Sequence, residues 1–302
     1  MRNDALEAVI ARIEEWRGRE VSYAPVDGGI TNANWRVHVA GAPHDYFVKL
    51  PGPGTEMFID RHAAHDASLV AAESGYGAPV VCYLPDLGVE VMQFLEGVRS
   101  ATNSDFQRVA VRRNAVTALR SFNRQRALNL TKTAFDMVDE HLADAERLRA
   151  HAPPDISWLR DNLELARAAV SASGIEVAPC MNDTLAANFM LDERDCVRLV
   201  DFEYAANNDV HYELAVWLGE MFYPPEVEHE SLEQYFGRVS AQVDARVQVY
   251  KAIADLKWAT WAMLQRRLSS ADFDYHKYGM WKYLRARTVI GDPRWERWLR
   301  QL

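Results

Sequence analysis

The stretch from residue 181 to 204 constrains this chain most, because it sets acidic and amide side chains on both sides of a short apolar run. Asp183 and Asn188 lie in a polar segment that breaks the surrounding helical periodicity. The run 196–200 is short enough for one buried strand, and Asp201 follows it directly. Carboxylate and amide oxygens grouped in this way are typical of a site for Mg²⁺ and phosphate. A polar turn before a strand that ends in aspartate is the alternative.

The composition is that of an ordinary globular protein, with 302 residues of which 49% are hydrophobic and 25% charged. This length suffices for one large domain or for two lobes around a cleft. The net charge of −9 argues against a nucleic-acid partner and suits a protein that accepts a small cation. The three cysteines show no paired spacing, so we expect a reducing cytoplasm. The sequence has no run of bilayer-spanning length, so we expect no membrane insertion.

The chain before residue 97 alternates turn signals with runs that are typical of strands. Asp27, Gly28 and Gly29 form a turn signal between two alternating runs, which predicts a hairpin. Small residues at its tip allow backbone N–H groups to approach an anion, although a plain surface hairpin has the same pattern. Lys49 lies inside the next apolar run, where an ammonium needs either an anionic partner or an edge that faces solvent.

Other segments have apolar residues at helical spacing. They cover residues 4–17, 59–74, 106–122, 135–149, 155–172, 212–222 and 246–268. Trp258 and Trp261 lie three positions apart and so share one helix face, and Tyr278 follows them. Such a pair is usual in a hydrophobic core. An aromatic cage that holds an ammonium group by cation–π attraction is the functional alternative.

Together these features resemble the choline/ethanolamine kinase family, whose members share the protein-kinase-like fold. That family carries a His-Asn-Asp-x-x-x-x-Asn loop, then an Asp-x-Glu-Tyr strand end that is followed soon by Asn. The matching residues are Asn182, Asp183, Asn188, Asp201, Glu203, Tyr204 and either Asn207 or Asn208. Met181 stands where the family has its loop histidine. The resemblance covers residues 24–288, and the catalytic loop and the tryptophan segment are its specific parts.

The resemblance implies a two-lobed α+β protein-kinase-like fold. Residues 1–97 would form an N-terminal antiparallel sheet with a helix, and residues 98–302 a larger, mainly helical lobe. It also implies ATP and Mg²⁺ as cofactors. The expected nucleotide-binding residues are Gly28, Gly29, Thr31, Asn32, Lys49, Gln93 and Leu95. The candidates for the carboxylate partner of Lys49 are Glu56 and Asp66, while His65 occupies the position expected for that partner.

The same resemblance implies a role for each residue of the catalytic segment. Asp183 would deprotonate the substrate hydroxyl, with Asn188 beside it in the catalytic loop. Asn188, Asp201 and Glu203 would serve the metal. Trp258, Trp261 and Tyr278 would line the acceptor pocket, with Glu220 and Tyr223 at its rim. The implied reaction is the ATP-dependent phosphorylation of choline or ethanolamine, a small cationic amine alcohol.

Two alternatives stay open at this point. The first is a related phosphotransferase for an aminoglycoside, thiamine or another amine alcohol, which a tryptophan pair buried in the core would favour. The second is a non-catalytic pseudo-kinase, which Met181 and the unclear partner of Lys49 would favour. The sequence separates neither choline from ethanolamine nor one oligomeric state from another.

Overall fold

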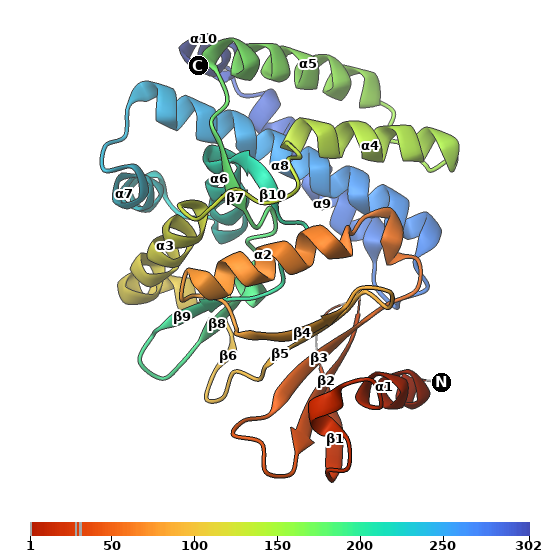
Figure 1. The fold of residues 1–302 in the computed structure, drawn as a ribbon. Coiled ribbons are helices and arrows are strands. Elements are labelled where there is room, and N and C mark those ends of the chain that lie inside the picture. The colour runs from red at the N-terminus through yellow and green to blue at the C-terminus, as the bar shows by residue number, and fades with distance from the viewer. Residues whose placement is uncertain (1, 28, 30–31) are drawn as a thin grey trace.

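The structure is a computed structural model that describes residues 2–27, 29 and 32–302. Gly28 and Thr31, two of the expected nucleotide-binding residues, lie outside the described residues. Figure 1 shows an antiparallel sheet next to the N-terminal helix and a larger, mainly helical part that holds the C-terminus. This is the expected two-lobed α+β fold. The placing of the lobe boundary at residue 97 stays a prediction.

The N-terminal sheet has the order β1-β2-β3-β5-β4, and each neighbouring pair is antiparallel. Its strands are β1 (Val21–Val26), β2 (Asn32–Val39), β3 (Tyr46–Pro51), β4 (Val80–Leu84) and β5 (Val89–Gln93). Alternate residues of β3, among them Val48, are buried against α1 (Arg2–Ile10) and the 3₁₀ turn Glu14–Trp16. The pairing of β1 with β2 confirms the predicted hairpin. The first helix is shorter than the expected 4–17, because the chain turns after Ile10.

Helix α2 (Arg61–Glu73) begins where the Asp60 carboxylate accepts the backbone N–H groups of His62 and Ala63, both at 3.0 Å. Its buried face, which includes Val70, belongs to the same hydrophobic core as the C-terminal helices. Figure 1 shows α2 between the sheet and these helices. The helix therefore joins the two parts of the molecule.

The C-terminal part surrounds α8 (Ala241–Leu268), which is buried on all sides along most of its length. The other helices are α3 (Val109–Asn123), α4 (Ala134–Arg147), α5 (Ile156–Ser173), α6 (Val210–Met221), α7 (Pro225–Phe236), α9 (Tyr275–Ile290) and α10 (Trp295–Gln301). The short strands are β6 (Arg99–Ser100), β7 (Val177–Cys180), β8 (Phe189–Leu191), β9 (Val197–Leu199) and β10 (Ala206–Asp209). The predicted helices are confirmed with shifted ends, whereas α7, α9 and α10 were not predicted.

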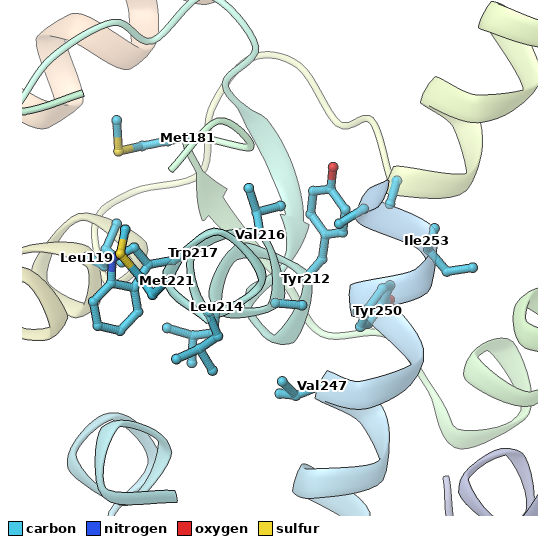
Figure 2. Close-up of a cluster of buried hydrophobic side chains, with 14 of the residues drawn as sticks. Leu119, Met181, Tyr212, Leu214, Val216, Trp217, Met221, Val247, Tyr250 and Ile253 are labelled. Carbon is cyan, nitrogen blue, oxygen red and sulfur yellow. The ribbon is translucent and has the colours of Figure 1, made fainter. Parts of the chain in front are cut away.

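The core between α6 and α8 also fixes the position of α8. Figure 2 shows Tyr212 and Trp217 of α6 with Tyr250 of α8 in this cluster. At the end of β10 the buried Asp209 accepts hydrogen bonds from the Arg246 guanidinium at 2.8 Å and the Tyr250 hydroxyl at 3.0 Å.

Within the described residues, every helix is too short or too polar to cross a bilayer. The expected cytoplasmic location stays a prediction.

Candidate active site

Asp183 lies in the loop that follows β7, and Asn188 holds its side chain. The Asn188 amide nitrogen donates to the Asp183 backbone oxygen at 2.8 Å and to its Oδ2 at 3.2 Å. Both side chains are buried, and Oδ1 of Asp183 has no hydrogen-bond partner in the part of the chain that the structure describes. The loop therefore presents one unengaged carboxylate oxygen, as a group that accepts a proton from a substrate requires.

The environment of Asp183 raises the pKa of its carboxyl group. Burial raises the pKa of Asp183 to about 7, and the nearby Asp201 carboxylate acts in the same direction. The Lys257 ammonium and the hydrogen bond from Asn188 lower the pKa but do not outweigh burial. A general base is most effective when its pKa lies near the working pH.

Glu213 of α6 supports the backbone of this loop through hydrogen bonds. Its two carboxylate oxygens accept the backbone N–H groups of Met181 and Asn182, both at 2.8 Å. Asn208 of β10 donates to the Asn182 side-chain oxygen at 2.9 Å. Asn182 itself has a φ of +60°, a left-handed conformation that needs such support. The backbone of the loop is thus held by hydrogen bonds, whereas the fully buried side chain of Met181 can only pack.

Sequence reasoning missed Glu213, although a signal for it exists. It is an acidic residue in the first turn of a largely apolar helix, and it is fully buried. Burial raises the pKa of Glu213 to about 7, while the two N–H groups that it accepts lower the pKa. A buried carboxylate in this position needs a hydrogen-bonding partner, and the catalytic loop provides it.

Asp201 follows β9 with a φ of +67° and faces Lys49 of β3. The Lys49 ammonium lies 2.6 Å from Asp201 Oδ1 and 3.1 Å from Glu203 Oε1. Burial lowers the pKa of Lys49, but the two carboxylates outweigh burial and raise it overall. Lys49 and these two expected metal residues therefore lie together.

The candidate partners of Lys49 on or before α2 were wrong. Asp66 points toward the C-terminal part, where it accepts from Arg126 and from the Asn129 backbone at 2.8 Å. Glu56 is exposed in a 3₁₀ turn. His65 lies 2.8 Å from Glu90 of β5. The segment after β9, which approaches β3 only in the folded chain, takes the place of these candidates.

Glu203 is the centre of a network of donors. Its Oε1 accepts from the Asn32 amide at 2.7 Å and from the Arg61 guanidinium, besides its contact with Lys49. Arg61 also donates to Thr55 at 2.7 Å. The expected nucleotide-binding residue Asn32 therefore joins the expected metal residue Glu203. No local pattern marks Arg61 in the sequence.

The side chains present fit a bound Mg²⁺ ion. Asn188 and Asp201 offer an amide oxygen and a carboxylate, and the Asn188 oxygen faces away from Asp183 because its nitrogen donates to it. Among the described residues there is no cluster of three or more histidine, cysteine or acidic side chains that could hold a metal ion. Proteins bind Mg²⁺ with one or two carboxylates together with phosphate and water, and Asp201 offers such a carboxylate.

The other expected nucleotide-binding residues lie along the sheet. Gly29 has a φ of +79°, a conformation that glycine adopts readily. Gln93 ends β5, and its backbone N–H donates to the Pro79 oxygen at 2.8 Å. Leu95 follows in the segment that leads to the C-terminal part and is half-buried. The adenine contacts expected of Gln93 and Leu95 stay predictions.

The expected acceptor residues form an aromatic cluster on α8 and α9. The ring centroid of Trp261 lies 5.5 Å from that of Trp258 and 6.1 Å from that of Tyr278, while Trp258 lies 5.3 Å from Tyr204. Tyr275 completes the cluster, which is separate from the main core. Both indole N–H groups are buried without a hydrogen-bond partner in the described part of the chain. The tryptophan pair is thus buried beside Tyr204 and outside the main core.

The two residues expected at the rim differ in their positions. Glu220 pairs with Lys282 and, at 3.2 Å, with Arg285, and Lys282 in turn lies 5.3 Å from the centre of the Tyr278 ring. Tyr223 is instead a residue of the main core, where its hydroxyl donates to the Phe106 oxygen at 3.0 Å. Phe222, which lies between Glu220 and Tyr223 in the chain, ends α6 in a left-handed conformation with a φ of +52°. The expectation of Tyr223 at the rim is therefore corrected.

Comparison with known proteins decides the family. A model of the choline/ethanolamine kinase family matches residues 23–235. The chain belongs to the choline/ethanolamine kinase family. It is 26% identical to a "Probable ethanolamine kinase" of Arabidopsis thaliana, over 85% of this chain and 76% of that protein. It is 21% identical to the "Probable choline kinase 2" of the same plant, over 92% of this chain and 89% of that protein.

The fold agrees with this choline/ethanolamine kinase assignment. A crystal structure of a choline/ethanolamine kinase family protein from Mesorhizobium loti superposes with a TM-score of 0.85 at 24% identity, covering 100% of this chain and 99% of that chain. The protein is accordingly a small-molecule kinase that uses ATP and has an alcohol group as its acceptor. The features that favoured a pseudo-kinase also have structural explanations, because Glu213 supports the loop and Asp201 pairs with Lys49.

Proposed function

We propose that this kinase transfers the terminal phosphoryl group of ATP to the hydroxyl of choline or ethanolamine, with Asp183 as the base. One observation carries the proposal: the unengaged Oδ1 of Asp183 lies in a loop whose neighbouring residues are a metal-type donor set and a cluster of aromatic rings. An acceptor that is both a cation and an alcohol has groups that match each of these parts.

In the reaction, Asp183 accepts the proton of the substrate hydroxyl as the hydroxyl oxygen forms a bond to the terminal phosphorus. The bond between that phosphorus and the bridging oxygen breaks, and ADP is the leaving group. Asn188 keeps Asp183 oriented through two hydrogen bonds. Such a reaction depends mainly on alignment and on electrostatic stabilisation.

Asn188 and Asp201 would hold Mg²⁺, and Glu203 would order the donors around it. When bound, the ion neutralises phosphate charge during transfer. Lys49 and the backbone near Gly29 and Asn32 would position the phosphates between the lobes 1–97 and 98–302. Trp258, Trp261 and Tyr278 would hold the ammonium group, with Glu220 near them.

The test is ATP-dependent phosphorylation of choline, ethanolamine, thiamine and an aminoglycoside, with Asp183→Asn as the inactive variant. The exposed Asp161→Asn serves as the matched control. We expect turnover of choline or ethanolamine that the first substitution abolishes and the second leaves unchanged. Turnover of thiamine or the aminoglycoside alone would refute the acceptor assignment. Full activity of Asp183→Asn would refute its role as the base.

A further inference from the structure

Lys257 precedes Trp258 on α8 and places its amino group on the aromatic cluster. Its Nζ lies 3.0 Å from the centre of the Trp258 ring and 4.2 Å from that of Tyr204. The side chain is fully buried, and Nζ has no hydrogen-bond partner within the described residues. A lysine buried in this way is rare unless a charge or a ring stabilises it. The Trp258 face is therefore already occupied by an amino group that belongs to the protein.

The surroundings of this group favour its uncharged amine form. Burial lowers the pKa of Lys257 well below its usual value, and Lys282 and Lys132 act in the same direction, while the Asp183 carboxylate raises the pKa. Glu220 and Asp255, the carboxylates next to the cluster on α6 and α8, are already paired with Lys282 and Arg285. A cationic acceptor thus meets lysine amino groups of the protein at two of the expected cage rings, since Lys282 also lies 5.3 Å from the centre of the Tyr278 ring.

Quaternary and primary ammonium groups depend on aromatic ring faces to different degrees. A quaternary ammonium has no N–H group, so aromatic faces supply most of its attraction. A primary ammonium has three donors and can use carboxylate or carbonyl oxygens instead. An Nζ at 3.0 Å from the ring centre leaves no room for a methylated nitrogen on the same face of Trp258. Loss of that face costs a quaternary acceptor more than a primary one.

We propose that Lys257 is a specificity-determining residue, which occupies the Trp258 face and selects a primary amine alcohol of the ethanolamine type against a quaternary one. This inference rests on the proposed function, because it concerns the acceptor of the same reaction. Lys257 would act by excluding one substrate class.

The kinetic test compares ethanolamine with choline for the wild type, Lys257→Met and Lys251→Met. Lys251 is the matched control, since it lies on the same helix but pairs with Glu228 away from the cluster. We expect the wild type to prefer ethanolamine, and Lys257→Met to shift kcat/KM toward choline by about tenfold through a lower KM. A wild type that prefers choline, or a preference that Lys257→Met leaves within about twofold, would overturn the inference.

A binding measurement without ATP separates this inference from the proposed function. Tetramethylammonium and methylammonium are titrated while tryptophan fluorescence is followed. The wild type should bind tetramethylammonium the more weakly, and Lys257→Met should bind it about tenfold more tightly. Absence of amine-alcohol turnover with this binding pattern intact would refute the proposed function alone. Preferential binding of tetramethylammonium to the wild type would refute the inference, and this arm stands even if Lys257→Met does not fold.

Discussion

The Glu213 carboxylate accepts the backbone N–H of Met181 at 2.8 Å, and through this bond α6 supports the loop that carries Asp183. The second carboxylate oxygen of Glu213 accepts the backbone N–H of Asn182. These two bonds hold the backbone of the two residues that precede Asp183.

Glu213→Gln should lower both activity and stability. Glutamine keeps one acceptor oxygen, but its amide nitrogen then faces a backbone N–H that has no other acceptor. We expect kcat to fall by about 100-fold through loop displacement and the free energy of unfolding to fall by about 1–3 kcal/mol. Steady-state kinetics and denaturant unfolding measure these effects, with the exposed Glu193→Gln as the control. Wild-type kcat in Glu213→Gln would contradict the supporting role.

Met181→His should destabilise the protein and leave it no more active. Met181 is fully buried in the main core, so an imidazole there buries polar nitrogens in an apolar site. We expect a loss of about 1–3 kcal/mol in the free energy of unfolding, whereas Met181→Leu should lose less than about 1.5 kcal/mol. Denaturant titration of both variants checks this. A histidine variant that is more active than the wild type would show that the loop lacks support.

The turnover rate should rise with pH through neutrality. Asp183 acts as a base only when deprotonated, and its pKa is raised to about 7. Below that value the active fraction, and with it kcat, should fall about tenfold per pH unit. Asp183→Asn should lose about 10²–10⁴-fold in kcat and lose this limb of the profile. A profile that is flat from pH 5 to 8 would argue against Asp183 as the titrating group.

Asp201→Asn should raise the Mg²⁺ requirement. The substitution removes the charge that would bind the ion and that also pairs with Lys49 at 2.6 Å. We expect half-maximal turnover at a Mg²⁺ concentration about tenfold higher, measured by Mg²⁺ titration at saturating ATP, and complete loss of turnover in the wild type when EDTA removes the metal. The exposed Asp161→Asn should titrate as the wild type does. An unchanged Mg²⁺ curve in Asp201→Asn would exclude this carboxylate as a ligand.

Trp261→Leu should weaken acceptor binding more than it slows transfer. The indole ring contacts Trp258 and Tyr278 and would supply cation–π attraction of about 0.5–2 kcal/mol. We therefore expect a KM for the acceptor that is higher by about 3–30-fold, with a similar KM for ATP. Trp281→Leu is the control, because Trp281 is exposed on α9. Equal effects of the two substitutions would remove the cage from the mechanism.

The sequence predicted the elements that carry the site better than it predicted their contacts. Local patterns were sufficient for the hairpin before β3, for the strand before Asp201 and for the helix face of Trp258 and Trp261, because each depends on residues close in the chain. The predicted carboxylate partners of Lys49 were wrong, because the approach of Asp201 to β3 is set only by tertiary packing.

Residues buried against their usual preference escaped prediction. Glu213 and Lys257 are charged side chains that composition rules place on the surface, and both are fully buried in the structure. Their contacts are seen only in the folded chain, where α6 brings Glu213 to the backbone of Met181 and α8 brings Lys257 to Tyr204. Periodicity indicates which face of a helix is apolar, but it does not indicate which neighbour accepts a charge.

Asp209, the neighbour of Asn208 in β10, anchors α8 without itself being one of the expected site residues. It binds Arg246 and Tyr250 of α8, and Trp258 and Trp261 lie further along the same helix. A substitution at Asp209 would therefore weaken the anchor of the helix that carries these two rings without changing the rings themselves. Directed evolution toward new acceptors thus has two kinds of target, the Asp209 anchor of α8 and the residues expected to line the acceptor pocket.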